Sequence, residues 1–214
     1  MLGALLAFTL AAAVLTVTPG LDTALVLRTA VVEGPARAMV AGLGICTGLF
    51  GWGLLVSAGL GALLAVSELA FDVLRIAGAL YLLYLGTRLL LRLRAPVSPM
   101  TVEREAGEDA TGDGEQRRWF IRGLLTNLLN PKVGAFYVTF LPQFIPAGVN
   151  VVSFSLLLAA IHAVEGVLWF ALLTRASTAA RRWLVRPLVQ RTLDGVTGGL
   201  FILFGVRLAV EYRH

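Results

Sequence analysis

Two charged residues, Asp22 and Lys132, stand inside long apolar stretches, and each follows closely on a proline. Near the centre of a bilayer, either charge would cost about 2.5 to 3.5 kcal/mol unless it is paired or hydrated. Two interpretations remain open from the sequence. The residues form a structural ion pair with each other, or Asp22 meets an ammonium group or a proton while Lys132 meets a carboxylate.

The prolines themselves open the backbone at both places. A proline cannot donate to the carbonyl four residues earlier, so Pro19 frees the carbonyl of Leu15 and Pro131 frees that of Asn127. The half-helix that begins after each break would point unpaired N–H groups and its positive dipole end into the protein, where a carboxylate could bind. The alternative is an ordinary proline kink that neighbouring helices pack and satisfy.

Further polar residues share these segments. Asn127 and Asn130 either hydrogen-bond a solute or cap the broken helix. His162 and Glu165 lie three residues apart and so on one helical face; we interpret His162 as a packing residue and Glu165 as a contact for a solute or a proton. The predicted binding or coupling site comprises Pro19, Gly20, Asp22, Asn127, Asn130, Pro131, Lys132 and Glu165.

The composition places these residues in a membrane protein. The chain of 214 residues is 57% hydrophobic and 14% charged, with a mean hydropathy of +0.82, which exceeds what one soluble core could bury. The net charge of +5 comes mostly from arginines between apolar runs, so we expect no nucleic-acid partner. One cysteine and two histidines cannot supply a disulfide framework or a tetrahedral metal site, and no phosphate-binding loop occurs, so we expect no metal and no cofactor.

Six apolar segments are long enough to cross a bilayer. We predict them at 2–32, 38–66, 71–91, 119–141, 151–174 and 193–210. The first is expected to be a retained helix, with a cleaved signal as the alternative. Residues 95–118 hold six of the 13 acidic residues and read as a polar linker, which divides the chain into units 1–94 and 119–214.

The basic residues predict the orientation. Fourteen of the 18 Lys and Arg residues fall on the side of the first, third and fifth loops, which places the linker in the cytoplasm and both termini outside. The two units share landmarks in the same order, a proline break near the start and a Gly-rich run near the end. A repeat of three helices must be inserted upside down, so we predict an all-α fold of two inverted three-helix repeats, with helices 1 and 4 broken.

The same residues resemble the LysE/RhtB family of amino-acid exporters over nearly the whole chain. The resemblance rests on the runs at 18–23, 78–86, 128–132 and 140–144, of which Asn130-Pro131-Lys132 with its Phe-Leu-Pro-Gln-Phe sequel is the most specific. The family usually has a second proline where Leu21 stands here. The resemblance implies export of amino acids or their analogues, exchanged for protons, with no ATP-binding domain.

The resulting hypothesis is a secondary transporter of the inner membrane that works by alternating access and is not an enzyme. Its partners would be an amino acid and membrane lipids, with a homodimer left open. One alternative is a cation or metal exporter, which the lack of clustered His, Cys and carboxylates disfavours. Another is an enzyme acting on lipid-linked substrates, although no nucleophile or metal-ligand cluster accompanies Asp22 and Glu165.

Overall fold

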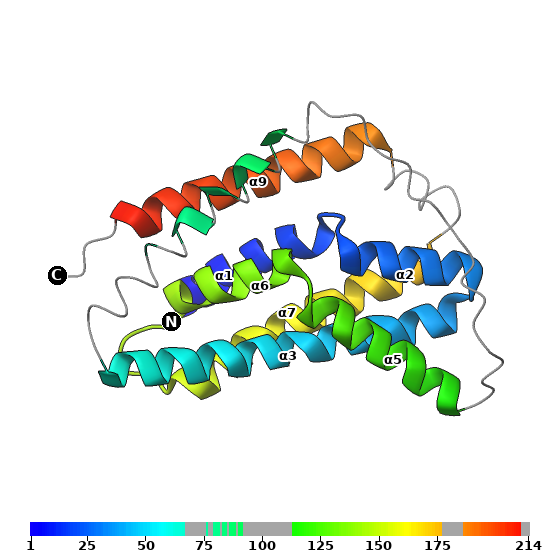
Figure 1. Cartoon of the computed structure of the whole chain (residues 1–214), viewed down its shortest axis with the longest axis horizontal. Coiled ribbons are helices and arrows are strands. Elements are labelled where there is room, and N and C mark those ends of the chain that lie inside the picture. Colours follow the sequence, from blue (N-terminus) through cyan, green and yellow to red (C-terminus); the bar gives the residue numbers. More distant parts are fainter. Residues whose placement is uncertain are drawn as a thin grey trace.

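The computed structural model describes residues 1–66, 113–176 and 186–210, together with single positions between 76 and 91. Every described element is a helix, in agreement with the predicted all-α class (Figure 1). In chain order they are α1 (Leu2–Val17), α2 (Leu21–Val32), α3 (Pro35–Val66), α5 (Asp113–Leu128), α6 (Pro131–Thr139), the short 3-10 helix η1 (Leu141–Phe144), α7 (Val151–Arg175) and α9 (Pro187–Val210).

The two predicted helix breaks are confirmed. The first apolar segment divides into α1 and α2, whose axes differ by 49°, and the fourth divides into α5 and α6. The two broken helices run in opposite directions, so that α1 lies beside α6 and α2 lies beside α5 (Figure 1). Both breaks therefore come to the middle of the molecule.

Helix α3 is the central support of this arrangement because it packs against α2, α5 and α7. Its contact with α5 is made backbone to backbone. A Cβ on Gly44 would collide with the carbonyl oxygen of Phe120, and a Cβ on Gly123 of α5 would collide with the carbonyl oxygen of Ala41. Glycines that allow such close approach are typical of helix interfaces in membranes.

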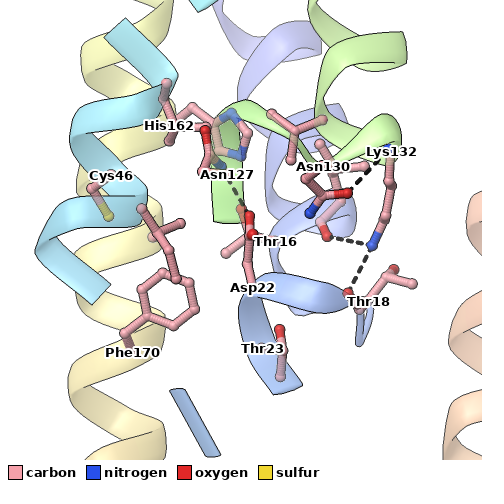
Figure 2. Close-up of a pocket in the computed structure, with 16 residues that line it drawn as sticks. Thr16, Thr18, Asp22, Thr23, Cys46, Asn127, Asn130, Lys132, His162 and Phe170 are labelled. Atoms are coloured by element: carbon pink, nitrogen blue, oxygen red, sulfur yellow. Dashed lines mark hydrogen bonds between the residues drawn. The ribbon is translucent and has the colours of Figure 1, made fainter. Parts of the chain in front are cut away.

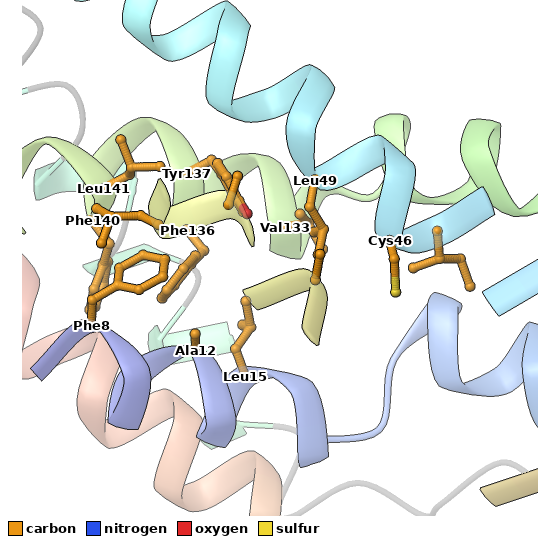
Figure 3. Packing of buried hydrophobic residues seen from close by; sticks show 14 of the residues in the cluster. Phe8, Ala12, Leu15, Cys46, Leu49, Val133, Phe136, Tyr137, Phe140 and Leu141 are labelled. Carbon is orange, nitrogen blue, oxygen red and sulfur yellow. The ribbon is translucent and has the colours of Figure 1, made fainter. Parts of the chain in front are cut away.

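An aromatic cluster fixes α1 against α6 and η1. The ring of Phe8 lies with its centroid 5.7 Å from that of Phe136 and 5.5 Å from that of Phe144, and Phe140 stacks on Phe136 at 5.1 Å. Figure 3 shows Phe8 beneath the ring layer of Phe136 and Phe140. Offset and edge contacts of this kind stabilise a core beyond the area they bury, and here they hold the half-helices on one side of the breaks.

A glycine-dependent turn joins α2 to α3. Gly34 has a φ of 98°, a conformation that other residues rarely adopt, and its N–H donates to Thr29 O at 3.0 Å. Pro35 then begins α3, where its missing N–H would have had no helical partner. Nearby, Arg37 forms ion pairs with Glu33 at 3.0 Å and with Glu115 of α5 at 2.7 Å.

The helix lengths suit a membrane. By length and apolar composition, the Pro35–Gly59 part of α3 and the whole of α7 could each cross a bilayer, and the bent pair of α1 and α2 would be a third span. On α7, Val164, Leu168 and Leu172 are each about 60% exposed and recur every four residues, as a lipid-facing strip does. The third predicted segment, at 71–91, lies largely outside the described residues, so the six-span arrangement stays a prediction.

One helix starts earlier than its apolar run. Helix α5 begins at Asp113, inside the stretch that the sequence assigned to the polar linker, whose residues 95–112 lie outside the described part. The extra turns carry exposed polar residues, and Glu115 among them pairs with Arg37. Hydropathy alone could not reveal this extension, because it is polar.

The glycine contact between α3 and α5 gives a test of the fold. Gly44→Ala should lower the free energy of unfolding by about 1 to 3 kcal/mol, because the added methyl group overpacks a backbone contact. Gly59→Ala on the same helix, where a Cβ would meet nothing within 4 Å, serves as the control and should not destabilise the protein. Thermal unfolding of the purified proteins in detergent compares them. Equal midpoints for all three would contradict the close contact.

Candidate functional site

A cavity of about 40 Å³ lies where the two helix breaks meet. Such a volume holds about three water molecules. Five of the eight predicted site residues line it: Gly20, Asp22, Asn127, Asn130 and Lys132. The remaining wall comes from residues of α1, α2, α3, α6 and α7: Leu15, Thr16, Thr18, Thr23, Ile45, Cys46, Leu49, Val133, His162, Gly166 and Phe170.

Lys132 is held by the backbone of the first break. Its Nζ donates to Leu15 O at 3.1 Å and to Thr18 O at 2.8 Å (Figure 2). Leu15 O is the carbonyl that Pro19 leaves without a helical donor, so the ammonium group replaces the missing N–H. Because an ammonium group has three N–H donors, one remains for another acceptor.

Asp22 is held by the second broken helix and not by Lys132. Its Oδ2 accepts a hydrogen bond from Asn127 Nδ2 at 2.9 Å, while its Oδ1 is buried and has no partner among the described residues. Within the part of the chain that the structure describes, no ion pair joins Asp22 to Lys132. The sequence left open whether Asp22 and Lys132 pair directly; in this conformation they do not.

The two breaks are satisfied differently. At the second, Asn130 Oδ1 accepts from Lys132 N at 3.1 Å and so caps α6, while Asn127 O accepts from Asn130 N at 3.0 Å and from Trp52 Nε1 at 3.3 Å. At the first, no side chain caps α2. Among the described residues, no side chain therefore occupies the N–H groups at the start of α2, whereas Asn130 occupies one at the start of α6; the sequence suggested that both ends could bind an anion.

A glycine positions Asn127 beside Asp22. A Cβ on Gly48 of α3 would lie 2.5 Å from Asn127 Oδ1 and 3.0 Å from its Cβ, so any side chain there would displace the asparagine. Asn127 is fully buried. The hydrogen bond to Asp22 thus depends on the absence of a side chain on α3.

His162 packs in the core, as the sequence suggested, and also lines the cavity, which the sequence did not suggest. Its Nδ1 is hydrogen-bonded to the hydroxyl of Tyr137 at 3.2 Å, and the two rings stack, as expected of a packing residue. It also lines the cavity. The sequence analysis also did not assign Thr16, Thr18 and Thr23 to the site. Their position around Pro19-Gly20 could have indicated that they line the cavity.

Three predicted site residues lie outside the cavity lining: Pro19, Pro131 and Glu165. The prolines act through the backbone that they leave unpaired. Both carboxylate oxygens of Glu165 are buried without a hydrogen-bond partner among the described residues, and so is Nε1 of Trp169, one turn further along α7. In the described part of the chain, no group of three or more His, Cys, Asp and Glu residues could hold a metal ion.

Comparisons with known proteins identify the family of the chain. The profile of the LysE type translocator family matches residues 13–212. The chain belongs to this family. No solved structure shows a significant match.

Relatives of the chain cover nearly its full length. An uncharacterized membrane protein of Bacillus subtilis, YrhP, is 32% identical over 97% of this chain and 99% of its own. A homoserine/homoserine lactone efflux protein of Salmonella typhimurium is 32% identical, over 97% and 96% of the two chains. A leucine efflux protein of an Enterobacter species is 30% identical, over 89% and 88%. The chain is therefore a membrane transporter and not an enzyme.

The hydrogen bond that closes the second break can be tested with two tryptophans. Trp52→Phe should lower the free energy of unfolding by about 1 kcal/mol more than Trp169→Phe, because only Trp52 Nε1 has an acceptor to lose. The two changes remove the same ring volume, and Trp169→Phe removes a buried N–H that has no partner among the described residues, so Trp52→Phe should be the more damaging change. Equal losses of stability would show that Asn127 O does not depend on Trp52.

Proposed function

We propose that this translocator exports amino acids or closely related small metabolites across the inner membrane, and that the cavity between the two helix breaks is its binding site. The observation that carries the proposal is the buried, unpartnered Oδ1 of Asp22 beside a lysine that is not paired with it. The efflux of homoserine and its lactone and of leucine by two relatives supports the same substrate class.

The α-ammonium group of the substrate would bind Asp22. An isolated buried carboxylate oxygen is costly, and a charged N–H donor is the partner that relieves the cost best. Asn127 holds Oδ2, which leaves Oδ1 for the incoming group. An ammonium group thus completes the set of contacts around Asp22.

The carboxylate group would bind at the first break. Lys132 and Gly20, the residue before α2, both line the cavity, and a Cβ on Gly20 would lie 3.7 Å from Lys132 Nζ. The ammonium group and the uncapped N-terminus of α2 thus offer positive charge and N–H donors side by side. A zwitterion matches one negative and one positive residue without adding net charge to the membrane interior. This accounts for two opposite charges that do not neutralise each other directly.

Transport requires the cavity to open. About 40 Å³ admits a few water molecules but not an amino acid, so the cavity must widen to hold the substrate. We propose that six spans form two inverted three-helix repeats, with the linker in the cytoplasm and both termini outside, and that the halves rock about the breaks to expose the site alternately. The antiparallel course of the broken helices supports this plan.

Glu165 is our candidate for proton coupling. Its carboxylate is enclosed in the middle of α7 without a partner among the described residues, a position in which an ionised group is costly. A bound proton would remove that charge, and hydration during opening would release it. The residue lies one position before Gly166, which lines the cavity, so both respond to the same movement of α7.

The two charged residues of the cavity, Asp22 and Lys132, provide the main test. Asp22→Asn should reduce export at least about tenfold, since a charge-assisted hydrogen bond to the substrate is lost. Exchange of the two residues, Asp22→Lys with Lys132→Asp, should also be inactive, because it would set a carboxylate against the carbonyl groups of Leu15 and Thr18. Export is measured in cells that lack other exporters and are loaded with amino acids by feeding dipeptides. Normal export by the exchanged protein would mean that the residues serve only to pair.

Coupling at Glu165 predicts a selective defect. In reconstituted vesicles, Glu165→Gln should retain exchange of labelled for unlabelled amino acid, which moves no net protons, but should lose accumulation driven by an imposed proton gradient. The exchange reaction is the internal control for folding and substrate binding. An equal loss of both activities, or of neither, would remove Glu165 from the coupling mechanism.

A further inference from the structure

The cavity has a second wall, which is apolar and lies opposite the polar groups of the breaks. Ile45, Cys46 and Leu49 of α3 and Gly166 and Phe170 of α7 form this side-chain wall. All five residues are buried. Figure 2 shows Cys46 and Phe170 on the far side of Asp22 from Lys132.

We propose that the side-chain wall receives the side chain of the exported amino acid and restricts transport to compact, uncharged side chains, with Gly166 setting the size limit. The inference rests on the proposed function, because it takes the ammonium and carboxylate groups to be bound at the breaks. With both groups held there, the substrate side chain points across the cavity toward α3 and α7.

The chemistry of the wall excludes charged side chains. None of its five residues offers a hydrogen-bonding group that could replace the hydration of a lysine ammonium group or a glutamate carboxylate. His162, one turn before Gly166, also lines the cavity, but its Nδ1 is engaged by Tyr137. The charged residues lining the described cavity, Asp22 and Lys132, are at the polar end, where they serve the main-chain groups of the substrate. A second charge would be buried without a partner.

The size limit comes from the contact between α7 and α3. A Cβ on Gly166 would lie 2.9 Å from Cys46 Sγ and 3.9 Å from Phe170 Cε2, both on the same wall. The first distance is shorter than a Cβ tolerates, so an added methyl group would displace Cys46 Sγ. Because Cys46 and Gly166 both line the cavity, we expect this displacement to narrow the space left to the substrate side chain.

A packing role for Gly166 makes a different prediction. If the glycine only lets α3 and α7 approach each other, a methyl group there would lower stability and the export of every substrate alike. If it limits the side-chain space, the larger substrate suffers more. The ratio of two export rates separates these roles, because a general loss of active protein cancels.

The test uses purified full-length protein in vesicles loaded with labelled alanine, leucine, lysine or glutamate. The wild-type protein should export alanine and leucine and should export lysine and glutamate at least about tenfold more slowly. Gly166→Ala should lower the leucine-to-alanine rate ratio by about tenfold, the discrimination that one methylene group commonly gives. Cys46→Ala added to Gly166→Ala removes the contacting sulfur and should restore the ratio.

The control is Gly59→Ala on α3, which adds a methyl group where no described residue lies within 4 Å and should keep the wild-type ratio. If Gly166→Ala does not fold, Cys46→Ala alone serves as the test. It enlarges the space beside the side-chain wall and should raise the ratio of the phenylalanine export rate to the leucine export rate. Export of lysine or glutamate as fast as leucine, or unchanged ratios in the variants, would overturn this inference and leave the proposed function intact. Failure of the wild-type protein to export any amino acid would instead refute the proposed function.

Discussion

The structure depends on the requirement that every carbonyl group at membrane depth finds a donor. Two prolines remove one helical donor each, and the chain replaces both reciprocally. Lys132, from the second half of the chain, donates to Leu15 O in the first, and Trp52, from the first half, donates to Asn127 O in the second, which also accepts from Asn130 N. Each half thus repairs the break in the other, and the cavity forms where these repairs meet.

This exchange of donors also explains why opposite charges coexist in the middle of the protein. Lys132 donates to backbone oxygens and Asp22 accepts from the amide of Asn127, so the two charges do not neutralise each other in an ion pair. The alternative, a closed ion pair, would stabilise the resting protein but would leave nothing for a ligand. A site that is only partly satisfied is less stable alone and more responsive to a matching solute.

The positions of the breaks and the lengths of the helices were predictable because they follow from local rules. Pro19 and Pro131 mark the breaks, and apolar length gives α1 to α3 and α7 to within a few residues. The partners of the polar groups were not predictable, because they depend on register between helices distant in sequence. Trp52 gave no signal of its bond to Asn127 O, and the cap by Asn130, which makes the two breaks unequal, was one of two open interpretations.

The backbone contact at Gly44 and Gly123 limits how the protein can move. Sliding α3 along α5 by one residue would carry Ile45 or Leu124 into a gap that has no room for a Cβ, so we expect the proposed halves to pivot at this contact and not to slide along it. The phenylalanine contacts of α1 with α6 and η1 are side-chain contacts, which can adjust to a change of tilt more readily than two backbones in contact. In the proposed rocking motion, the glycines would therefore lie at the pivot.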